Sequence, residues 1–348
     1  MVMIDPVSAE GVPAPPAVPE ATSRRRHPVA SFLLRRFGGA ILTLLVASFA
    51  IFMATSVLPG NTAEVVLGRS ASPQAVQQLE QKLGIEGSVP QRYLTWLCGV
   101  VRGDFGDSAI GVAQGREDAS VLAAIRKPLL YSSLLAAITA VLLIPLTLLL
   151  GGVAGIRAGR RTDHAISLPS LVLSGLPEFV VGTGLIFVFF SLLGWLPPNA
   201  LMSGGSIGGY ARQLVLPALT LLAVAVGSGI RQVRSGMMEV LEEEYVRYAR
   251  LNGVRESRVL ARYALRNALA PSVQILAQNL QYLVGGIIIV ESVFSYPGLG
   301  TFLVNAVSTR DVVEVQAAAI ILAAVYITFN VLADLIVIFL VPRLRTAL

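Results

Sequence analysis

The stretch that decides the fold runs from Leu129 to Ala154 and reads LLYSSLLAAITAVLLIPLTLLLGGVA, without one charged residue. A helix rises about 1.5 Å per residue, so about 20 apolar residues suffice to cross the hydrocarbon core of a bilayer. Backbone groups in lipid must be satisfied internally, and a barrel strand would alternate over about ten residues. This stretch therefore predicts a transmembrane helix.

Five further segments pass the same test, so we expect an all-α membrane protein with six transmembrane helices. The expected spans are Phe37–Leu58, Leu129–Ala154, Ile166–Leu193, Leu214–Ile230, Ser272–Phe294 and Val315–Val341. A proline inside a helix removes one hydrogen-bond donor and kinks the helix. We expect such kinks at Pro145, Pro169, Pro177 and Pro217.

Composition agrees with a membrane protein. The chain is 54% hydrophobic and only 14% charged, and its mean hydropathy is +0.71, whereas about a quarter of the residues of soluble domains are charged. The single cysteine, Cys98, can form no internal disulfide and no metal cage.

The net charge of +6 reflects topology, because arginine and lysine are retained on the cytoplasmic side of a membrane. Arginines gather before the first span, in the second and fourth connections and after the last span. They are Arg24, Arg25, Arg26, Arg35 and Arg36; then Arg157, Arg160 and Arg161; then eight from Arg231 to Arg266; then Arg343 and Arg345. Both termini are therefore expected in the cytoplasm, and no nucleic-acid partner is expected.

The chain divides into a tail and one membrane domain. Residues 1–30 are rich in proline and alanine and predict a disordered cytoplasmic tail. Residues 31–348 form the membrane domain, with an external loop at about 59–128 and a cytoplasmic loop at about 231–271. In the external loop Ser72 can cap a helix that Pro73 starts, and GDFGDS at 103–108 suits a tight turn, which together suggest a small external subdomain.

The cytoplasmic loop contains the segment EYVRYARLNGVRESRVLARYALRN, residues 244–267, which predicts two helices that meet at Gly253. Two sets of side chains recur at helical spacing. An approximate apolar stripe on the first helix holds Val240, Tyr245, Tyr248, Ala249 and Leu251, and a basic face on the second holds Arg258, Arg262 and Arg266. The residues alone leave three interpretations open: a solvated loop, a DNA-binding helix-turn-helix, or a docking element for a soluble partner.

This segment resembles the loop of ABC importer permeases, whose pattern is Glu-Ala-Ala, three residues, Gly, nine residues, Ile-x-Leu-Pro. Ala249 and Gly253 fit that pattern, while Leu265-Arg266 replaces Leu-Pro. The match is closer to the dipeptide, oligopeptide and nickel permeases, in particular to the first permease subunit, and covers about residues 31–346. Further matching stretches are LPG at 58–60, the region 83–108, GWLPP at 194–198 and VESVFSYPGLG at 290–300.

The resemblance implies a type I importer permease fold and a set of partners. These are a second homologous permease, two cytosolic ATPases or one fused ATPase, an external substrate-binding lipoprotein and membrane lipid. It also implies that the Gly253 loop is seated in the ATPase. The implied coupling residues are Glu244, Tyr245, Tyr248, Ala249, Arg250, Gly253, Arg258 and Arg262.

The chain itself is expected to catalyse nothing. A phosphate-binding loop needs Gly-Lys followed by Ser or Thr, and neither Lys82 nor Lys127 follows a glycine. ATP and magnesium are therefore expected on the partner ATPases, with no cofactor or metal bound by this chain.

Polar residues inside the spans are candidates for the wall of a translocation path, because ionisable groups in hydrocarbon usually face a bundle interior or water. The candidates are Glu178, Gln278, Gln281, Glu291, Asn330 and Asp334. The alternatives are that Asn330 and Asp334 bond a neighbouring helix, that Glu178 serves packing, and that the glutamines of the fifth span lie at the membrane surface.

The favoured function is import of dipeptides or oligopeptides driven by ATP. Nickel or another small solute is the alternative within the family, although the spans carry no cluster of histidine, cysteine or methionine. An ion-coupled secondary transporter would show internal repeats, and a membrane sensor would need a soluble output domain. Neither feature is found in the sequence.

Overall fold

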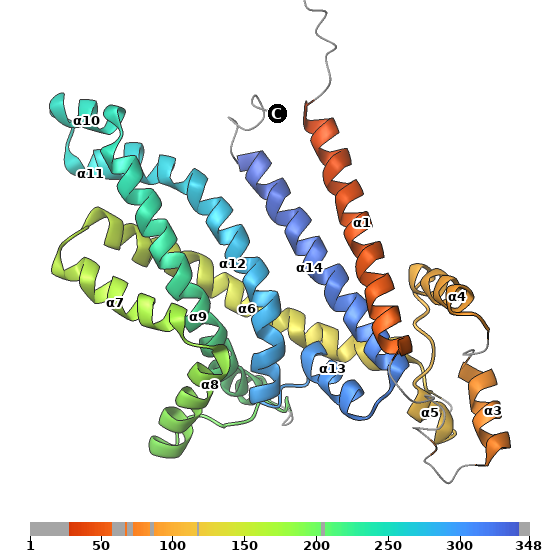
Figure 1. The fold of residues 1–348 in the computed structure, drawn as a ribbon. Coiled ribbons are helices and arrows are strands. Elements are labelled where there is room, and N and C mark those ends of the chain that lie inside the picture. Colours follow the sequence, from red (N-terminus) through yellow and green to blue (C-terminus); the bar gives the residue numbers. More distant parts are fainter. Residues whose placement is uncertain are drawn as a thin grey trace, which may run out of the picture.

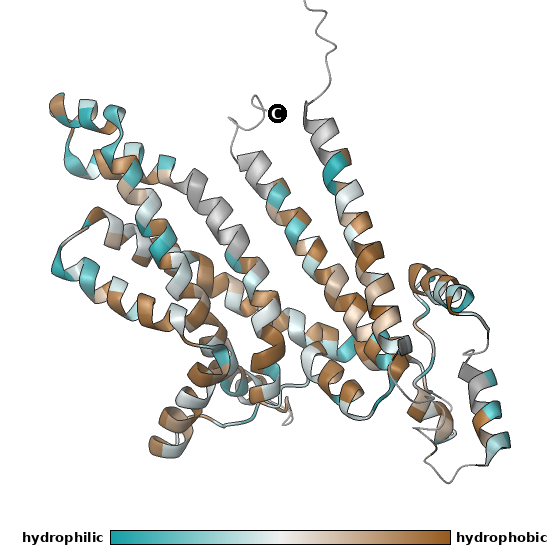
Figure 2. Ribbon diagram, in the orientation of Figure 1, coloured by the Kyte–Doolittle hydropathy of each residue, from teal (hydrophilic) through white to brown (hydrophobic). Residues whose placement is uncertain are grey.

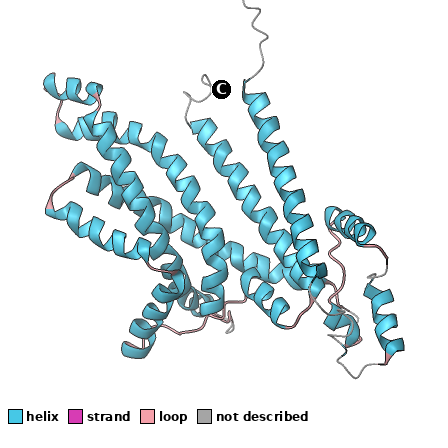
Figure 3. Cartoon of the chain, in the orientation of Figure 1, coloured by secondary structure: helices cyan, strands magenta, loops and turns pink. Residues whose placement is uncertain are grey.

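The structure is a computed structural model that describes residues 28–57, 67, 72–83, 87–116, 118–202 and 206–340. These residues are almost entirely helical (Figures 1 and 3). Their only β pairing is one antiparallel bridge between Asp107 and Ser120. The predicted all-α class is confirmed.

The described helices follow one another along the chain in this order. They are α1 Pro28–Val57, α3 Pro73–Leu83, α4 Val89–Arg102, α5 Ala109–Ala113, α6 Val121–Ile156, α7 Arg161–Gly175, α8 Glu178–Ile186, α9 Ile207–Glu242, α10 Glu244–Leu251, α11 Glu256–Arg258, α12 Arg266–Val293, α13 Leu299–Ser308 and α14 Val312–Leu340. Two π-helical segments, η1 Phe187–Leu192 and η2 Val259–Leu265, continue α8 and precede α12.

Among the described residues, four helices are long and apolar enough to cross a membrane, and a bent pair makes a fifth if it counts as one span. The four spans are Leu34–Ser56, Val121–Ile156, Ile207–Glu242 and Val312–Leu335. Helix α12 runs through the expected fifth span, and its apolar described part is Tyr282–Val293. The count of six remains a prediction.

The third span is not the single helix that we expected. Helices α7 and α8 meet at 109°. Leu176 between them is extended, with φ −94° and ψ 135°, as expected for a residue before a proline. Pro177 has no N–H to continue the helix. By contrast, α6, α7 and α9 run through Pro145, Pro169 and Pro217 as unbroken elements.

Helices extend beyond several of the apolar windows. Residues 231–242 of the predicted cytoplasmic loop belong to α9, and residues 266–271 belong to α12. Residues 121–128 of the predicted external loop belong to α6, and α1 already begins at Pro28, inside the predicted tail. Lipid requires an apolar surface, but a helix needs only its own hydrogen bonds and can continue into water. Residues 1–27 of the predicted tail lie outside the described residues.

The core is centred on α6 and α9, which approach each other at glycines. A Cβ on Gly151 would lie 2.7 Å from Val233 Cβ, and one on Gly155 would lie 2.6 Å from Met237 Cβ. Small residues let membrane helices pack closely. This contact makes α6 and α9 one tightly packed unit, against which α7, α8 and α12 lie.

The two ends of the bundle differ. The start of α1, the end of α14 and helices α10 and α11 lie at one end, while α3, α4, α5, α8 and α13 lie toward the other (Figure 1). Ser72 Oγ accepts from Ala75 N at 3.3 Å, which confirms the predicted cap of α3. The predicted turn at 103–108 is confirmed, since Gly103 and Gly106 have φ of 81° and 79°.

Asp311 attaches that turn to the spans. Its Oδ2 accepts from Ser108 Oγ at 2.6 Å and from Ile110 N at 3.1 Å, and its Oδ1 accepts from Glu314 N at 3.2 Å. One buried carboxylate thus joins α5 to the first turn of α14. Sequence analysis did not find this role, because Asp311 lies outside the expected spans and carries no motif.

Candidate functional site

A helical hairpin projects from the core at the end where the described chain begins and ends (Figure 1). Glu243 is extended and separates α9 from α10. Helix α10 stops at a turn in which Gly253 N donates to Arg250 O at 3.0 Å and Val254 N donates to Ala249 O at 3.2 Å. Gly253 has φ +70°, a left-handed conformation that glycine adopts without a Cβ penalty. Two helical segments therefore meet at Gly253, as predicted.

The predicted stripe of α10 divides between the buried and the exposed face of the hairpin. Val246, Ala249 and Val259 form its small core, with Val254 and Tyr263 packed against them. The other face of α10 presents side chains that the sequence placed in the stripe. Tyr245, Tyr248 and Leu251 are 39%, 67% and 76% exposed.

The exposure of these three side chains has a simple geometric reason. Val246 and Ala249, three residues apart, share the face of α10 that meets η2, so residues about half a turn away point outward. An aromatic and apolar surface is consequently left open at the tip of the hairpin.

One ion pair closes the hairpin. Arg250 Nη2 lies 2.8 Å from Glu256 Oε1, and Arg250 Nε lies 3.2 Å from Glu256 Oε2. The hydrogen bonds raise the pKa of the Arg250 guanidinium and lower the pKa of the Glu256 carboxyl. Arg250 is therefore engaged within the hairpin. Glu244, Arg258 and Arg262 are exposed and form no ion pair within the part of the chain that the structure describes.

The base of the hairpin is tied to the spans. Met237 and Val240 of α9 pack with Ala264 of η2 and Ala268 of α12. Because α9 is continuous from Ile207 to Glu242, its last turns belong both to the hairpin and to the bundle. A force on the hairpin is thus applied directly to α9.

A second link joins α9 to α7. Arg234 Nε and Nη2 donate to the two carboxylate oxygens of Asp163 at 2.6 and 2.8 Å. Asp163 is 1% exposed and also accepts from Gly159 N and Ser167 Oγ, both at 2.8 Å. Bidentate arginine–carboxylate pairs fix geometry as well as charge. Sequence analysis missed this pair, and the available signal was a single acid directly after the arginine pair of the second connection.

Glu291 does not face an open path in this structure. It is fully buried. Ser132 Oγ donates to its Oε1 at 2.5 Å, and Gly300 N donates to its Oε2 at 2.7 Å. Leu299 N donates to Ser132 Oγ at 2.8 Å. Together Glu291 and Ser132 cap the first turn of α13, which explains the SYPGLG stretch as a structural turn.

The other path candidates have varied surroundings. Arg36 of α1 donates to Asn330 Oδ1 at 3.2 Å and forms an ion pair with Asp334, which ties α1 to α14. Glu178 starts α8 and accepts from Tyr282 Oη at 2.6 Å. The side chains of Gln278 and Gln281 lie outside the described residues.

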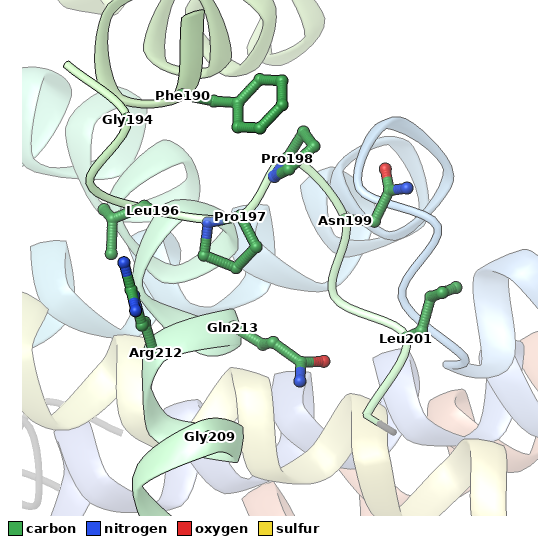
Figure 4. A pocket seen from close by; sticks show the side chains of 10 residues that line it. All are labelled: Phe190, Gly194, Leu196, Pro197, Pro198, Asn199, Leu201, Gly209, Arg212 and Gln213. Carbon is green, nitrogen blue, oxygen red and sulfur yellow. The ribbon is translucent and has the colours of Figure 1, made fainter. Parts of the chain in front are cut away.

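The connection between η1 and α9 forms a pocket of about 510 Å³, toward the end of the bundle opposite the hairpin (Figure 4). Its walls come from the GWLPP stretch and the start of α9. The lining residues are Phe190, Gly194, Leu196, Pro197, Pro198, Asn199, Leu201, Gly209, Arg212 and Gln213. Arg212 Nε donates to Trp195 O at 3.0 Å, and Gln213 Oε1 accepts from Met202 N at 2.8 Å. These two bonds hold the loop against α9.

Comparison with known proteins identifies the chain. Residues 144–346 match the family described as binding-protein-dependent transport system inner membrane component, and residues 29–114 match the N-terminal part of such membrane components. The chain belongs to this family. It is thereby an ABC transporter permease of type I fold and a multi-pass inner membrane protein.

Several relatives of this permease cover it almost throughout. A probable peptide ABC transporter permease of Sinorhizobium fredii is 30% identical over 90% of the chain and 99% of its own length. Glutathione transport system permeases of Shigella flexneri and of Escherichia coli K12 are each 32% identical over 90% of the chain and 99% of their own length.

Proposed function

We propose that this permease imports dipeptides or oligopeptides and is driven by ATPases that bind the hairpin at Gly253. The observation that carries the proposal is the aromatic surface of Tyr245, Tyr248 and Leu251 at the tip of a rigid hairpin. The relatives named for peptides and for glutathione favour a peptide over nickel or another small solute. Family membership argues against an ion-coupled secondary transporter.

The assembly that we propose contains four kinds of subunit. A second homologous permease completes the translocation path, two ATPases or one fused ATPase bind ATP and magnesium, and an external lipoprotein delivers the substrate. The hairpin then faces the cytoplasm, and so do both termini, since the described chain begins and ends at the hairpin's end of the bundle (Figure 1). No nucleic acid takes part.

Within the hairpin the candidate residues divide into two groups. Ala249, Arg250 and Gly253 shape it, through burial, an ion pair and a left-handed turn. The exposed side chains contact the ATPase, and they are Glu244, Tyr245, Tyr248, Arg258 and Arg262. Contact between one rigid helical element and a groove suits transmission of a push.

Two sets of contacts transmit a push on the hairpin to the spans. Met237 and Val240 connect η2 to α9, and the Asp163–Arg234 pair connects α9 to α7. Helix α7 leads to the break at Pro177, beside which Glu178 lies. Glu178, Gln278, Gln281, Asn330 and Asp334 remain candidates for the path, whereas we assign Glu291 to positioning α13.

The test of coupling is Gly253→Trp in the assembled transporter. We expect the variant to insert and assemble but to lose uptake and the stimulation of ATPase activity by loaded binding protein. The matched control is Gly103→Trp. Gly103 also has positive φ and open space where a Cβ would stand, with no atom within 4 Å, but it lies far from the hairpin. Normal uptake by Gly253→Trp would refute the assignment.

The basic face is tested separately by reversing charge at Arg258 and Arg262 together. We expect the ATPases to be lost during purification in moderate salt, since exposed charges steer and hold partners through screened attraction. Arg116→Glu, at an exposed site remote from the hairpin, serves as control. Recovery of the ATPases at the wild-type yield from the double variant would exclude a docking role for this face.

A further inference from the structure

Helix α4 is an amphipathic helix whose exposed face has an apolar half and a polar half. It spans Val89–Arg102 and has no buried residue. Leu94 and Val101 are 58% and 79% exposed. Thr95 follows Leu94, and Arg102 follows Val101. Both are exposed, and each lies about 100° further round the helix than the apolar residue before it. Figure 2 shows brown and teal on the same turns of α4.

The contacts of α4 place it beside the membrane span of α1. Its Tyr93 ring packs edge-on against Phe49 and Phe52 of α1, with ring centroids 5.5 and 5.4 Å apart. Tyr93 Oη and Ser48 Oγ share a hydrogen bond of 2.9 Å. All three α1 residues belong to the span Leu34–Ser56.

Helix geometry gives the distance of this contact from the end of the α1 span. Ser48 lies eight residues before the end of that span at Ser56, which corresponds to roughly 12 Å along a helix axis. Helix α4 lies beside this part of α1 (Figure 1). The exposed Leu94 and Val101 thus lie on a helix that packs beside the apolar surface of α1, where Phe49 is 52% exposed.

The remaining side chains of α4 have the chemistry of a helix at the membrane surface. Such helices combine an apolar side, a basic polar side and aromatic residues at headgroup level. Trp96 and Tyr93 supply the aromatic rings, and Arg92 and Arg102 supply the positive charge. Arg92 Cζ lies 6.0 Å from the centroid of the Phe52 ring.

We propose that α4 is a membrane-surface helix that binds the lipid bilayer through Leu94, Leu97 and Val101 and thereby anchors the segment between α1 and α6. Thr95 and Arg102 then face water and the lipid headgroups. The proposal rests on the chain being a membrane protein and is independent of the proposed substrate and of the hairpin.

The test compares two adjacent positions. In a Cys98→Ser background, which removes the single native cysteine, Leu94→Cys and Thr95→Cys are each labelled with an environment-sensitive fluorophore. The full-length chain, with the subunits that co-purify, is reconstituted into phosphatidylcholine vesicles. Fluorescence is quenched either by nitroxide carried on lipid acyl chains or by aqueous iodide.

We expect the lipid-borne quencher to act at least threefold more strongly on the label at 94 than on the label at 95, and iodide to act in the opposite order. Equal iodide access at both positions would overturn the proposal, because the face would then be in water. Protection of position 94 from both quenchers would also overturn it, because another protein surface would then cover α4. The native Cys98 in the unsubstituted chain provides a third labelled position, and we expect lipid quenching there to lie between the other two values.

Discussion

The hairpin at residues 243–265 and the turn at residues 290–300 carry the two most specific sequence signals, yet they are built in opposite ways. The hairpin is held by a small core and directs tyrosines outward. In the turn, Phe294 and Tyr296 are fully buried, and Tyr296 Oη donates to Tyr131 O at 2.8 Å. One motif presents a surface, and the other closes on the protein itself.

The glycines of the hairpin and of the turn also serve different purposes. Gly253 has φ +70° and no atom within 4 Å of a Cβ position, so it serves backbone conformation. Gly300 has backbone close to it instead, since a Cβ there would lie 2.6 Å from Ile288 Cα, and a Cβ at Gly298 would overlap the Glu291 carboxylate. Glycine in a motif can therefore mark either a turn or a close approach, and only the surroundings distinguish the two.

The largest loss of stability should come from Gly300→Ala. The added methyl group cannot be accommodated without moving α13 away from α12, and overpacking costs about 1–3 kcal/mol or more. The free energy of unfolding, measured by denaturation in mixed micelles, should fall by about 3 kcal/mol. A change in the unfolding free energy below about 0.5 kcal/mol would show that α13 is not held rigidly against α12.

Glu291→Ala should be about as damaging. It leaves Gly300 N and Thr301 N without their acceptor, and the Ser132 hydroxyl donor without its acceptor. Buried groups left unpaired cost about 1–3 kcal/mol each. Faster amide hydrogen exchange at residues 299–301 would locate the effect.

Glu291→Gln is the matched control for that experiment, because it keeps one carbonyl oxygen for the two amides. We expect it to lose at most half as much unfolding free energy as Glu291→Ala. If both variants exchanged like the wild type, Glu291 would not cap α13.

A smaller loss of stability is expected for Gly253→Ala. A left-handed conformation costs a residue with a Cβ about 1 kcal/mol, and no clash adds to this. If the unfolding free energy instead fell as far as for Gly300→Ala, the distinction between a conformational glycine and a packing glycine would be broken.

The smallest loss of stability should come from removing the Arg250–Glu256 ion pair. Both side chains are more than one-third exposed, and such pairs contribute about 0.2–1 kcal/mol. A double-mutant cycle with Arg250→Gln and Glu256→Gln measures the coupling.

The pH dependence of that pair has a definite sign. Hydrogen bonding to Arg250 lowers the pKa of Glu256 in the folded state. The contribution is therefore complete above the pKa of an unfolded glutamate and is lost as pH falls through the lowered folded value. A coupling that grew on acidification would contradict this assignment.

Sequence reasoning predicted the helical class, the hairpin and the cap at Ser72, because each depends on neighbours along the chain. It grouped Tyr245 and Tyr248 with Ala249 in one stripe, whereas only Ala249 faces the core of the hairpin and Val246, which the stripe left out, lies beside it. It also interpreted Glu291 as a path residue, whereas its partners Ser132 and Gly300 lie 159 and 9 residues away. Periodicity does not identify which of two possible faces finds a partner.

The sequence by itself determined that the chain enters a membrane, since runs of apolar residues long enough to cross lipid leave the backbone no choice but a helix. It also determined where Gly253 turns the chain, because a left-handed residue is a local requirement. Tertiary structure alone decided that Pro177 breaks its span while Pro145, Pro169 and Pro217 lie in continuous helices, and which carboxylates hold helices together. Asp163, Glu291 and Asp311 have partners distant in the sequence, and burying a charge is tolerated only where the fold brings such partners within hydrogen-bond reach.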